Sequence, residues 1–314
     1  MKKAIYSLIL IVAVFSSQSA LGWNSTGHQL VARIAWDNMT DTAKENVINL
    51  LMQTPSDACF PTLATDARPL KVRQRELFMV AATWPDIIRP NNKNGHTDTR
   101  PCIKLHQRDW HFVDHFWSGI SGDPNSPPHD EPIPIELVNA VERLQTFRPS
   151  VVSNLPPTER AMKLAWILHL VGDIHQPLHA SGHVTALPNE KKGDAGGNTF
   201  ALGPKLSLHS YWDGIVDRAD PQKPNESLPN YFDRVANEFE TAKPKSTFTI
   251  LPGKFDKWAL ESLERAKNKA YPKSLQRNVM PGTTYQQSTF LVAQESIAEG
   301  GYRLADLMNQ LFGH

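Results

Sequence analysis

The chain has 314 residues, with 33 Lys and Arg against 32 Asp and Glu, 12 His, 2 Cys and 40% hydrophobic residues. This is the composition of an ordinary globular protein, which excludes a disordered chain, a collagen-like fibre and a disulfide-dense mini-protein. The near-zero net charge argues against a protein that coats nucleic acid through a basic field, but it leaves room for an enzyme that binds phosphate through metal ions.

The first 22 residues have the features of a secretory signal peptide. Two lysines precede an apolar stretch over residues 4–15, and Ala20 and Gly22 place small side chains before a cut at Trp23. The apolar stretch is too short to cross a membrane, since a spanning helix needs about 20 residues. Cleavage removes two lysines and no acid, which leaves 31 basic and 32 acidic residues. We expect a secreted or periplasmic protein without a membrane anchor.

Helical periodicity dominates the rest of the chain. It predicts helices over residues 28–39, 40–52, 135–147, 158–174, 258–268 and 285–311. Weak strand patterns occur at residues 199–202 and 247–251. Long segments rich in Pro, Gly, Asn and Asp predict loops over residues 89–103, 118–134, 181–205 and 218–232. We therefore expect one all-α domain over residues 23–314.

The two cysteines, Cys59 and Cys102, lie in one loop-rich region. An oxidising compartment favours a disulfide between them, which would tie this region down. The alternative is a pair of free buried thiols.

Several histidines stand at spacings that suit metal binding. His169 and Asp173 are four residues apart on one face of the helix predicted over 158–174, and His179 follows just beyond its end. His209 and Asp213 repeat the spacing of four. Nitrogen and carboxylate donors without thiolates fit zinc or a similar divalent ion, and a mixed set often leaves a position open for catalysis. A single such pair is more often a hydrogen-bonded pair than a metal site, so spacing alone does not decide.

Six blocks in chain order carry a more specific signal. They are Trp-Asn-Ser-Thr-Gly-His at 23–28, Thr-Trp-Pro-Asp-Ile-Ile-Arg at 83–89, Trp-His-Phe-Val-Asp at 110–114, His-Leu-Val-Gly-Asp-Ile-His-Gln-Pro-Leu-His at 169–179, Gly-Gly-Asn at 196–198 and His-Ser-Tyr-Trp-Asp at 209–213. Together they resemble the secreted zinc-dependent nucleases of the S1/P1 family, whose fold is related to bacterial zinc phospholipase C.

The resemblance implies an all-α fold of the phospholipase C type around a cleft with three zinc ions. The first ion would be held by Asp86, His111, His169 and Asp173. The second would be held by His28, by a shared Asp173, and by the α-amino and carbonyl groups of Trp23. The third would be held by His179, His209 and Asp213. The free α-amine exists only after cleavage before Trp23.

The resemblance also implies the activity. The protein would be an endonuclease that hydrolyses single-stranded DNA and RNA to 5′-phosphate products by metal-activated hydroxide, with 3′-nucleotidase activity left open. The expected catalytic residues are Asp86 and Arg89, and Arg89 would neutralise developing negative charge. Phe112 would stack on an unpaired base, Asp114 would bond the base edge, and Asn198 would contact substrate. We expect a monomer.

Two other functions stay open at this point: phospholipase C activity on the same scaffold, and a secreted zinc-binding protein without activity. Asp213, where the phospholipases carry Glu, and the pair Phe112 and Asp114 favour the nuclease. No role is assigned to residues 214–280. The remaining histidines are expected to be surface or hydrogen-bonding residues: His96, His106, His115, His129, His175, His183 and His314.

Overall fold

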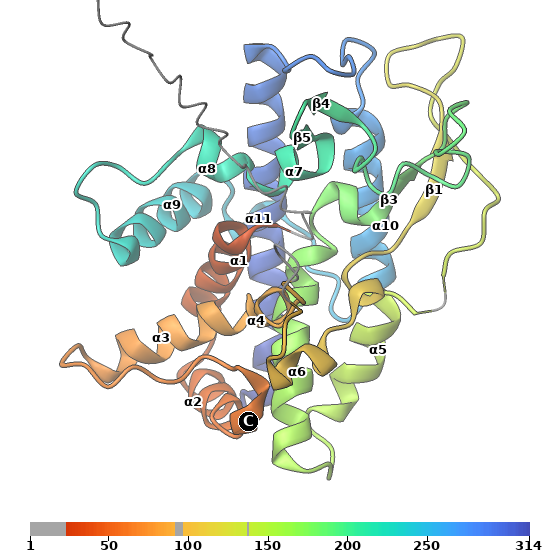
Figure 1. The fold of residues 1–314 in the computed structure, drawn as a ribbon. Coiled ribbons are helices and arrows are strands. Elements are labelled where there is room, and N and C mark those ends of the chain that lie inside the picture. Colours follow the sequence, from red (N-terminus) through yellow and green to blue (C-terminus); the bar gives the residue numbers. More distant parts are fainter. Residues whose placement is uncertain (1–22, 92–96, 137) are drawn as a thin grey trace, which may run out of the picture.

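The computed structural model describes residues 23–91, 97–136 and 138–314; the predicted signal peptide and His96 lie outside the described residues. Helices dominate (Figure 1), which confirms the all-α class. The α-helices are α1 (Ser25–Asn38), α2 (Asp41–Leu51), α3 (Leu70–Ala81), α4 (Trp84–Ile87), α5 (Ala140–Ser150), α6 (Pro157–Asp173), α7 (Leu208–Asp213), α8 (Ile215–Ala219), α9 (Leu228–Ala242), α10 (Phe255–Arg265) and α11 (Thr283–Phe312). Short helical turns of other types are η1 (Ser56–Ala58), η2 (Pro101–Leu105), η3 (Arg108–His111), η4 (Pro177–Ala180), η5 (Lys245–Thr247) and η6 (Ala266–Ala270).

Local sequence explains where several helices begin. The side chain of Asn24 accepts the Gly27 amide at the start of α1, at 3.1 Å. Thr40 accepts the Ala43 amide at the start of α2, at 3.2 Å. Both are N-cap bonds that satisfy amides without a partner inside the helix. α6 begins with Pro157, at a position where a missing N–H costs nothing.

The longest helix, α11, runs through the length of the molecule (Figure 1). It packs against α1, α2, α6, α8 and α9, and most of its side chains between residues 293 and 308 are buried. α6 packs in turn against α1, α2 and α5. The buried apolar side chains of these helices belong to one connected cluster, so α1 and α6 are held rigidly against each other.

The described residues also contain five short strands: β1 (His115–Ser118), β2 (His129–Asp130), β3 (Ser181–His183), β4 (Ala201–Gly203) and β5 (Leu206–Ser207). β1 pairs antiparallel with β2 and parallel with β3, with Phe116 opposite Gly182. β4 and β5 form a separate antiparallel pair. The pairing of β1 with β3 lays the chain that follows His111 beside the chain that follows His179.

The helix predicted over residues 135–147 begins later than expected, at Ala140. Asn139 caps it, because its side chain accepts the Glu142 amide at 3.0 Å. Ile135 and Val138 therefore lie outside the helix, although their spacing suits one, and Leu137 lies outside the described residues.

The prediction of a strand over residues 247–251 was wrong, because these residues form no strand. Thr247 ends the turn η5, and the carbonyls of Ile250 and Leu251 accept the indole N–H of Trp258 instead of pairing with a strand. The strand predicted over residues 199–202 is confirmed in part by β4.

The helices α3 and α9 were missed by the sequence analysis, as were the short helices α4, α7 and α8. The first half of α3 is strongly charged, which hides its apolar face. α9 begins inside the loop predicted over residues 218–232, so that prediction was wrong at its end. Its buried residues follow helical spacing: Tyr231, Phe232, Val235, Ala236 and Phe239.

Cys59 and Cys102 form a disulfide, which confirms the predicted bridge. The bridge links η1 to η2 and encloses α3 and α4. Within the described residues, no helix combines the length and apolar character that a bilayer span requires.

Candidate metal centre

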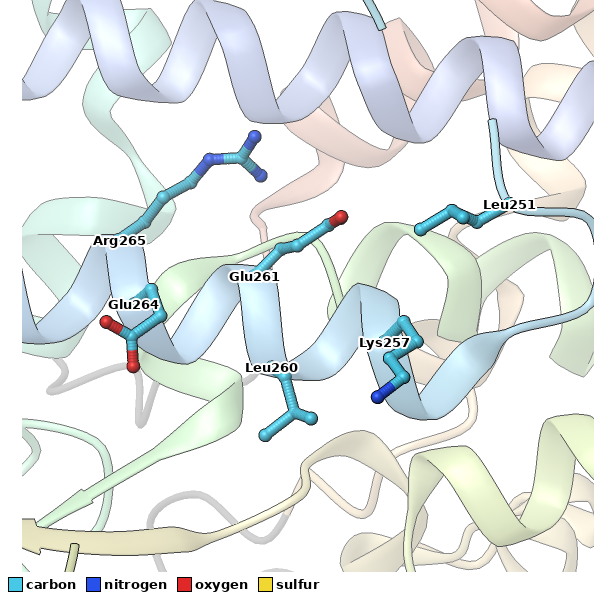
Figure 2. Close-up of a pocket in the computed structure, with 6 residues that line it drawn as sticks. All are labelled: Leu251, Lys257, Leu260, Glu261, Glu264 and Arg265. Atoms are coloured by element: carbon cyan, nitrogen blue, oxygen red, sulfur yellow. The ribbon is translucent and has the colours of Figure 1, made fainter. Parts of the chain in front are cut away.

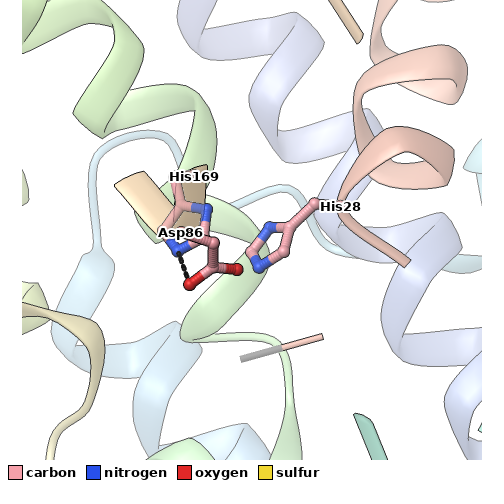
Figure 3. A group of neighbouring side chains, drawn as sticks. All are labelled: His28, Asp86 and His169. Atoms are coloured by element: carbon pink, nitrogen blue, oxygen red, sulfur yellow. Dashed lines mark ion pairs between the residues drawn. The ribbon is translucent and has the colours of Figure 1, made fainter. Parts of the chain in front are cut away.

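All eight side chains predicted as metal ligands converge in the structure. They form three groups in which one donor atom from each residue lies within 4.8 Å of the others: His28, Asp86 and His169; His111, His169 and Asp173; His179, His209 and Asp213. Figure 3 shows His28 from α1, Asp86 from α4 and His169 from α6 around a common point. Six separate segments of the chain supply the eight side chains, since only α6 and α7 supply two each.

The helices approach closely at this point. A Cβ atom added to Gly172 on α6 would lie 2.6 Å from Nδ1 of His28 on α1, which is closer than real Cβ contacts. Glycine is therefore required beside Asp173 for the His28 ring to reach its place.

Asp173 lies at the centre of the donor set and is fully buried. Its Oδ2 atom is 3.1 Å from both His111 Nδ1 and His169 Nε2. Its Oδ1 atom is 3.4 Å from His28 Nε2 and 3.5 Å from His179 Nδ1. Burial alone would raise the pKa of this carboxyl, but the surrounding histidines, His169 first, hold the pKa well below its usual range. One ionised carboxylate is thus shared among four imidazoles.

Backbone carbonyls fix the tautomer of three histidines. Their Nδ1–H groups donate at 2.7–2.8 Å in the pairs His169 to Ala82, His179 to His111 and His209 to Gly196. A carbonyl oxygen only accepts, so Nδ1 carries the proton and, in the neutral ring, Nε2 keeps a lone pair. This is the arrangement of metal-binding histidines, which donate their outer nitrogen to a carbonyl or carboxylate.

The contact between His179 and His209 fits a metal site most clearly. Their Nε2 atoms are 3.2 Å apart, and burial lowers the pKa of His179 to about 3 and of His209 to about 4, so both rings are neutral near pH 7. Two lone pairs therefore face each other. Asp213 Oδ2 lies 3.6 Å from His209 Nε2 without a hydrogen-bond partner. Ligands about 2.0–2.1 Å from a tetrahedral zinc ion are about 3.4 Å apart, which these distances match.

The other predicted ligands also present buried atoms that have no hydrogen-bond partner. Both ring nitrogens of His28 and the Oδ1 atoms of Asp86 and Asp173 are buried without hydrogen-bond partners. Burial disfavours the charged form of His169, but Asp173 and Asp86 outweigh this and raise the pKa of its imidazole to about 9. The donor set thus attracts positive charge, and its nitrogen and oxygen atoms fit a divalent metal ion.

The sequence profile of the S1/P1 nucleases matches residues 23–313, which is nearly the whole described chain. The chain belongs to the S1/P1 nuclease family. The resemblance inferred from six sequence blocks is therefore confirmed. The protein is a hydrolase that acts on the phosphodiester bonds of nucleic acid.

Individual relatives of this S1/P1 nuclease carry consistent names. Endonuclease 5 of Arabidopsis thaliana is 26% identical, and the alignment covers 96% of this chain and 95% of that protein. Endonuclease 2 of Arabidopsis thaliana is 24% identical over 99% of both chains. Nuclease S1 of Aspergillus oryzae is 23% identical over 63% of this chain and 55% of its own length.

Residues between the donors of this S1/P1 nuclease hold them in place. Gln176 donates from Nε2 to Asp213 Oδ1 at 2.7 Å, a contact that the sequence analysis did not foresee. His175 points away from the donors: its Nδ1–H donates to the Val171 carbonyl, and Arg303 donates to its Nε2 at 3.1 Å. His175 is therefore a hydrogen-bonded core residue, as expected.

Trp23 and Arg89 also lie beside the donor set. Trp23 is buried and packs on Gly27, and the next amide, of Asn24, donates to the Asp213 carbonyl at 3.1 Å. The backbone of Arg89 bonds to the Asp86 carbonyl at 3.2 Å. Burial lowers the pKa of the Arg89 guanidinium, while the nearby charge of Asp86 opposes this change.

The three predicted substrate-binding residues lie in different surroundings. Phe112 follows His111 directly and is partly exposed. Burial, with the charges of Asp194 and Glu136, raises the pKa of Asp114 to about 7. Asn198 is exposed, and its side-chain amide donates to the Ala195 carbonyl at 2.8 Å.

His106, to which the sequence analysis gave no role, is a neighbour of the donors. Its ring lies 6.0 Å from the ring of His111. Burial, together with the nearby His111, lowers the pKa of His106 to about 4.

A separate surface pocket lies along α10 (Figure 2). Its lining residues include none of those predicted for the site: Leu251, Lys257, Leu260, Glu261, Glu264 and Arg265. Figure 2 shows Glu261 and Arg265 on the side of α10 that faces α11, where they pair with Arg303 and Glu299. The metal centre is therefore the better candidate for the chemistry of the nuclease.

Proposed function

We propose that this S1/P1 nuclease is a secreted, zinc-dependent endonuclease that cleaves single-stranded DNA and RNA to 5′-phosphate products, with three zinc ions per chain. The observation that carries the proposal is the 3.2 Å contact between the Nε2 lone pairs of His179 and His209, with the unpartnered Asp213 Oδ2 beside them. Two neutral rings cannot donate to each other through Nε2, and a divalent ion bound by both nitrogens and by Asp213 would satisfy the three donors.

We assign the ligands in three sets. Asp86, His111, His169 and Asp173 would hold the first ion; His28, Asp173 and the terminal amine and carbonyl of Trp23 the second; His179, His209 and Asp213 the third. The two oxygens of Asp173 face different histidines, which supports a bridging role. Buried Trp23 at the start of α1 supports a terminal ligand made by cleavage before this residue.

Bound zinc supplies Lewis acidity, which stabilises negative charge at phosphate and makes water a nucleophile near neutral pH. The chain's own side chains then act on the substrate. Arg89, whose guanidinium interacts electrostatically with Asp86, neutralises charge on a phosphate oxygen. A guanidinium can donate hydrogen bonds to two phosphate oxygens at once. The backbone amide of Arg89 donates to the Asp86 carbonyl, which fixes the start of this side chain one turn from Asp86.

Phe112 and Asp114 account for a preference for unpaired bases. An aromatic ring can stack only on a base whose face is free, which favours single strands. Asp114, with a pKa raised to about 7 by burial, is present near neutral pH in both protonation states, so it can either accept from or donate to a base edge.

The test is an activity assay on protein that begins at Trp23. Single-stranded DNA, RNA, duplex DNA and phosphatidylcholine are each incubated with the protein, with and without a chelator, and the ends of the nucleotide products are identified by mass spectrometry. We expect release of 5′-phosphorylated nucleotides from single strands, loss of release with chelator, and recovery with zinc. Cleavage that survives complete metal removal would contradict the proposal.

Two variants sharpen this assay. His209→Ala is expected to bind one zinc ion fewer, whereas the control His129→Ala, which removes an exposed imidazole bonded to Ser118, is expected to bind as many as the wild type. A protein with one extra residue before Trp23 is expected to lack the second ion. Full zinc content in that protein would refute the terminal-amine ligand.

A further inference from the structure

A left-handed turn lies against the third group of donors. Three consecutive residues have positive φ angles: Ala195 at 52°, Gly196 at 60° and Gly197 at 82°. A Cβ atom on Gly196 would lie 2.3 Å from the Leu178 carbonyl oxygen, so the turn is also tightly packed. Left-handed backbone is unfavourable for a residue such as alanine, so other contacts must hold this turn.

The turn controls the orientation of His209. The Gly196 carbonyl accepts the His209 Nδ1–H at 2.7 Å, which fixes the tautomer and directs Nε2 toward His179. The Gly197 carbonyl accepts the backbone amide of His209 at 3.3 Å. Movement of the turn would therefore rotate or release the imidazole.

Asp194 anchors the turn through its carboxylate. Oδ2 accepts the hydroxyl of Tyr271 at 2.7 Å, and Oδ1 accepts the amide of His183 in β3 at 3.0 Å. The amide of Gly197, inside the turn, also bonds to this carboxylate. The backbone carbonyl of Asp194 accepts the Thr199 amide at 3.2 Å and so closes the turn. The carboxylate is buried and joins three segments of the chain.

Tyr271 connects the turn to the rest of the fold. Its side chain is buried, and its ring packs 4.7 Å from the ring of His183, 5.4 Å from Trp117 and 6.1 Å from Phe200. The ring contacts fix the position of the hydroxyl, and the hydroxyl fixes Asp194. Tyr271 lies in the segment 214–280, to which the sequence assigned no role.

We propose that Asp194 and Tyr271 are positioning residues for the zinc site of His179, His209 and Asp213. They hold the 195–197 turn, whose Gly196 carbonyl orients the His209 ring. The inference rests on the proposed zinc function. Loss of an outer hydrogen-bond partner of a metal-binding histidine costs about 10- to 100-fold in metal affinity or activity.

The substitution Tyr271→Phe removes the hydroxyl and keeps the packed ring. We expect the zinc affinity of one site to fall about 10-fold in competition with a chromophoric chelator, with the other sites unchanged. This is the lower end of the range for a direct partner, because Tyr271 acts on His209 through Asp194 and the turn. His209→Ala identifies which step of the titration belongs to this site. The matched control is Tyr302→Phe, which removes a hydroxyl that donates to the Lys243 carbonyl at 3.0 Å, and we expect wild-type affinity at every site.

A second readout does not depend on metal. In zinc-free protein labelled at histidine, the exchange of the His209 Nδ1 proton with solvent is measured by NMR. We expect Tyr271→Phe to accelerate it about 10-fold or more, while the His175 Nδ1 proton, bonded to Val171, keeps its wild-type rate. Unchanged exchange with unchanged zinc affinity would overturn the inference even if the variant unfolds more easily. A wild type that binds no zinc would overturn the proposed function, and the exchange rate would still decide whether the turn orients His209.

Discussion

The disulfide between Cys59 and Cys102 should contribute a large share of the stability of the fold. The two cysteines are 43 residues apart, and the enclosed loop contains α3, α4 and the predicted ligand Asp86. We consider the double substitution Cys59→Ala and Cys102→Ala. Alanine is preferred to serine because Cys102 is fully buried, where a hydroxyl without a partner would add its own cost.

The expected loss follows from the length of the loop. In the chain-entropy description, closing a loop of 43 residues lowers the entropy of the unfolded chain by about 13 cal/mol/K. At 25 °C this corresponds to about 4 kcal/mol of stability. A loss of this size is a large fraction of the 5–15 kcal/mol that typically stabilises a folded protein.

Urea unfolding followed by tryptophan fluorescence measures the difference. The oxidised wild type should be about 4 kcal/mol more stable than the double variant. Reductant should weaken the wild type by a similar amount and leave the double variant unchanged, which serves as the control. A difference below about 1 kcal/mol would refute the reasoning, because it would mean that the open loop of the unfolded chain is already restrained without the bond.

Three further predictions concern buried groups. Gly172→Ala places a methyl group 2.6 Å from the His28 ring, so it should cost about 1–3 kcal/mol and lower nuclease activity at least about 10-fold; wild-type activity in a steady-state assay would contradict it. Arg277→Met leaves the fully buried Glu190 carboxylate without its cation, which should cost about 3–5 kcal/mol in urea unfolding. The double variant with Glu190→Gln should lose clearly less, and equal losses would argue against the ion pair. Burial raises the pKa of Asp194 to about 6 from 3.8, so the folded state holds a proton that the unfolded chain releases in this range, and stability falls as the pH rises through it. Measured without metal, the wild type should therefore lose about 3 kcal/mol relative to Asp194→Asn between about pH 4 and pH 6.5, and parallel pH curves for the two proteins would exclude this effect.

The predicted donor residues could be found from the sequence because their spacing is local. His169 and Asp173, like His209 and Asp213, stand one helical turn apart; α6, which presents the first pair, forms as expected, whereas α7, which presents the second, was not predicted as a helix. The ordered blocks then supplied the remaining donors, and the structure brings all eight side chains together.

The residues that position the predicted ligands are not marked by a comparable local sequence pattern. The Gly196 carbonyl orients His209 only because the backbone adopts a left-handed turn, and a Gly-Gly pair is compatible with many turns. Tyr271 reaches Asp194 from a distant segment, so nothing in the spacing of the two residues marks the contact. Gln176 is different: it lies inside the 169–179 block, and an amide beside two donors could have been recognised as their partner.

The order of segments along the chain has a consequence for synthesis. His28 lies on α1, the first helix of the described residues, and α1 packs against α11, which ends at Phe312. The helix that supports His28 is therefore synthesised after all of the predicted ligands. A chain released before α11 would contain every predicted donor and still lack the surface against which α1 and α6 pack. Products that end before α11 should thus be inert, and nucleolytic activity should emerge only after α11 has been synthesised.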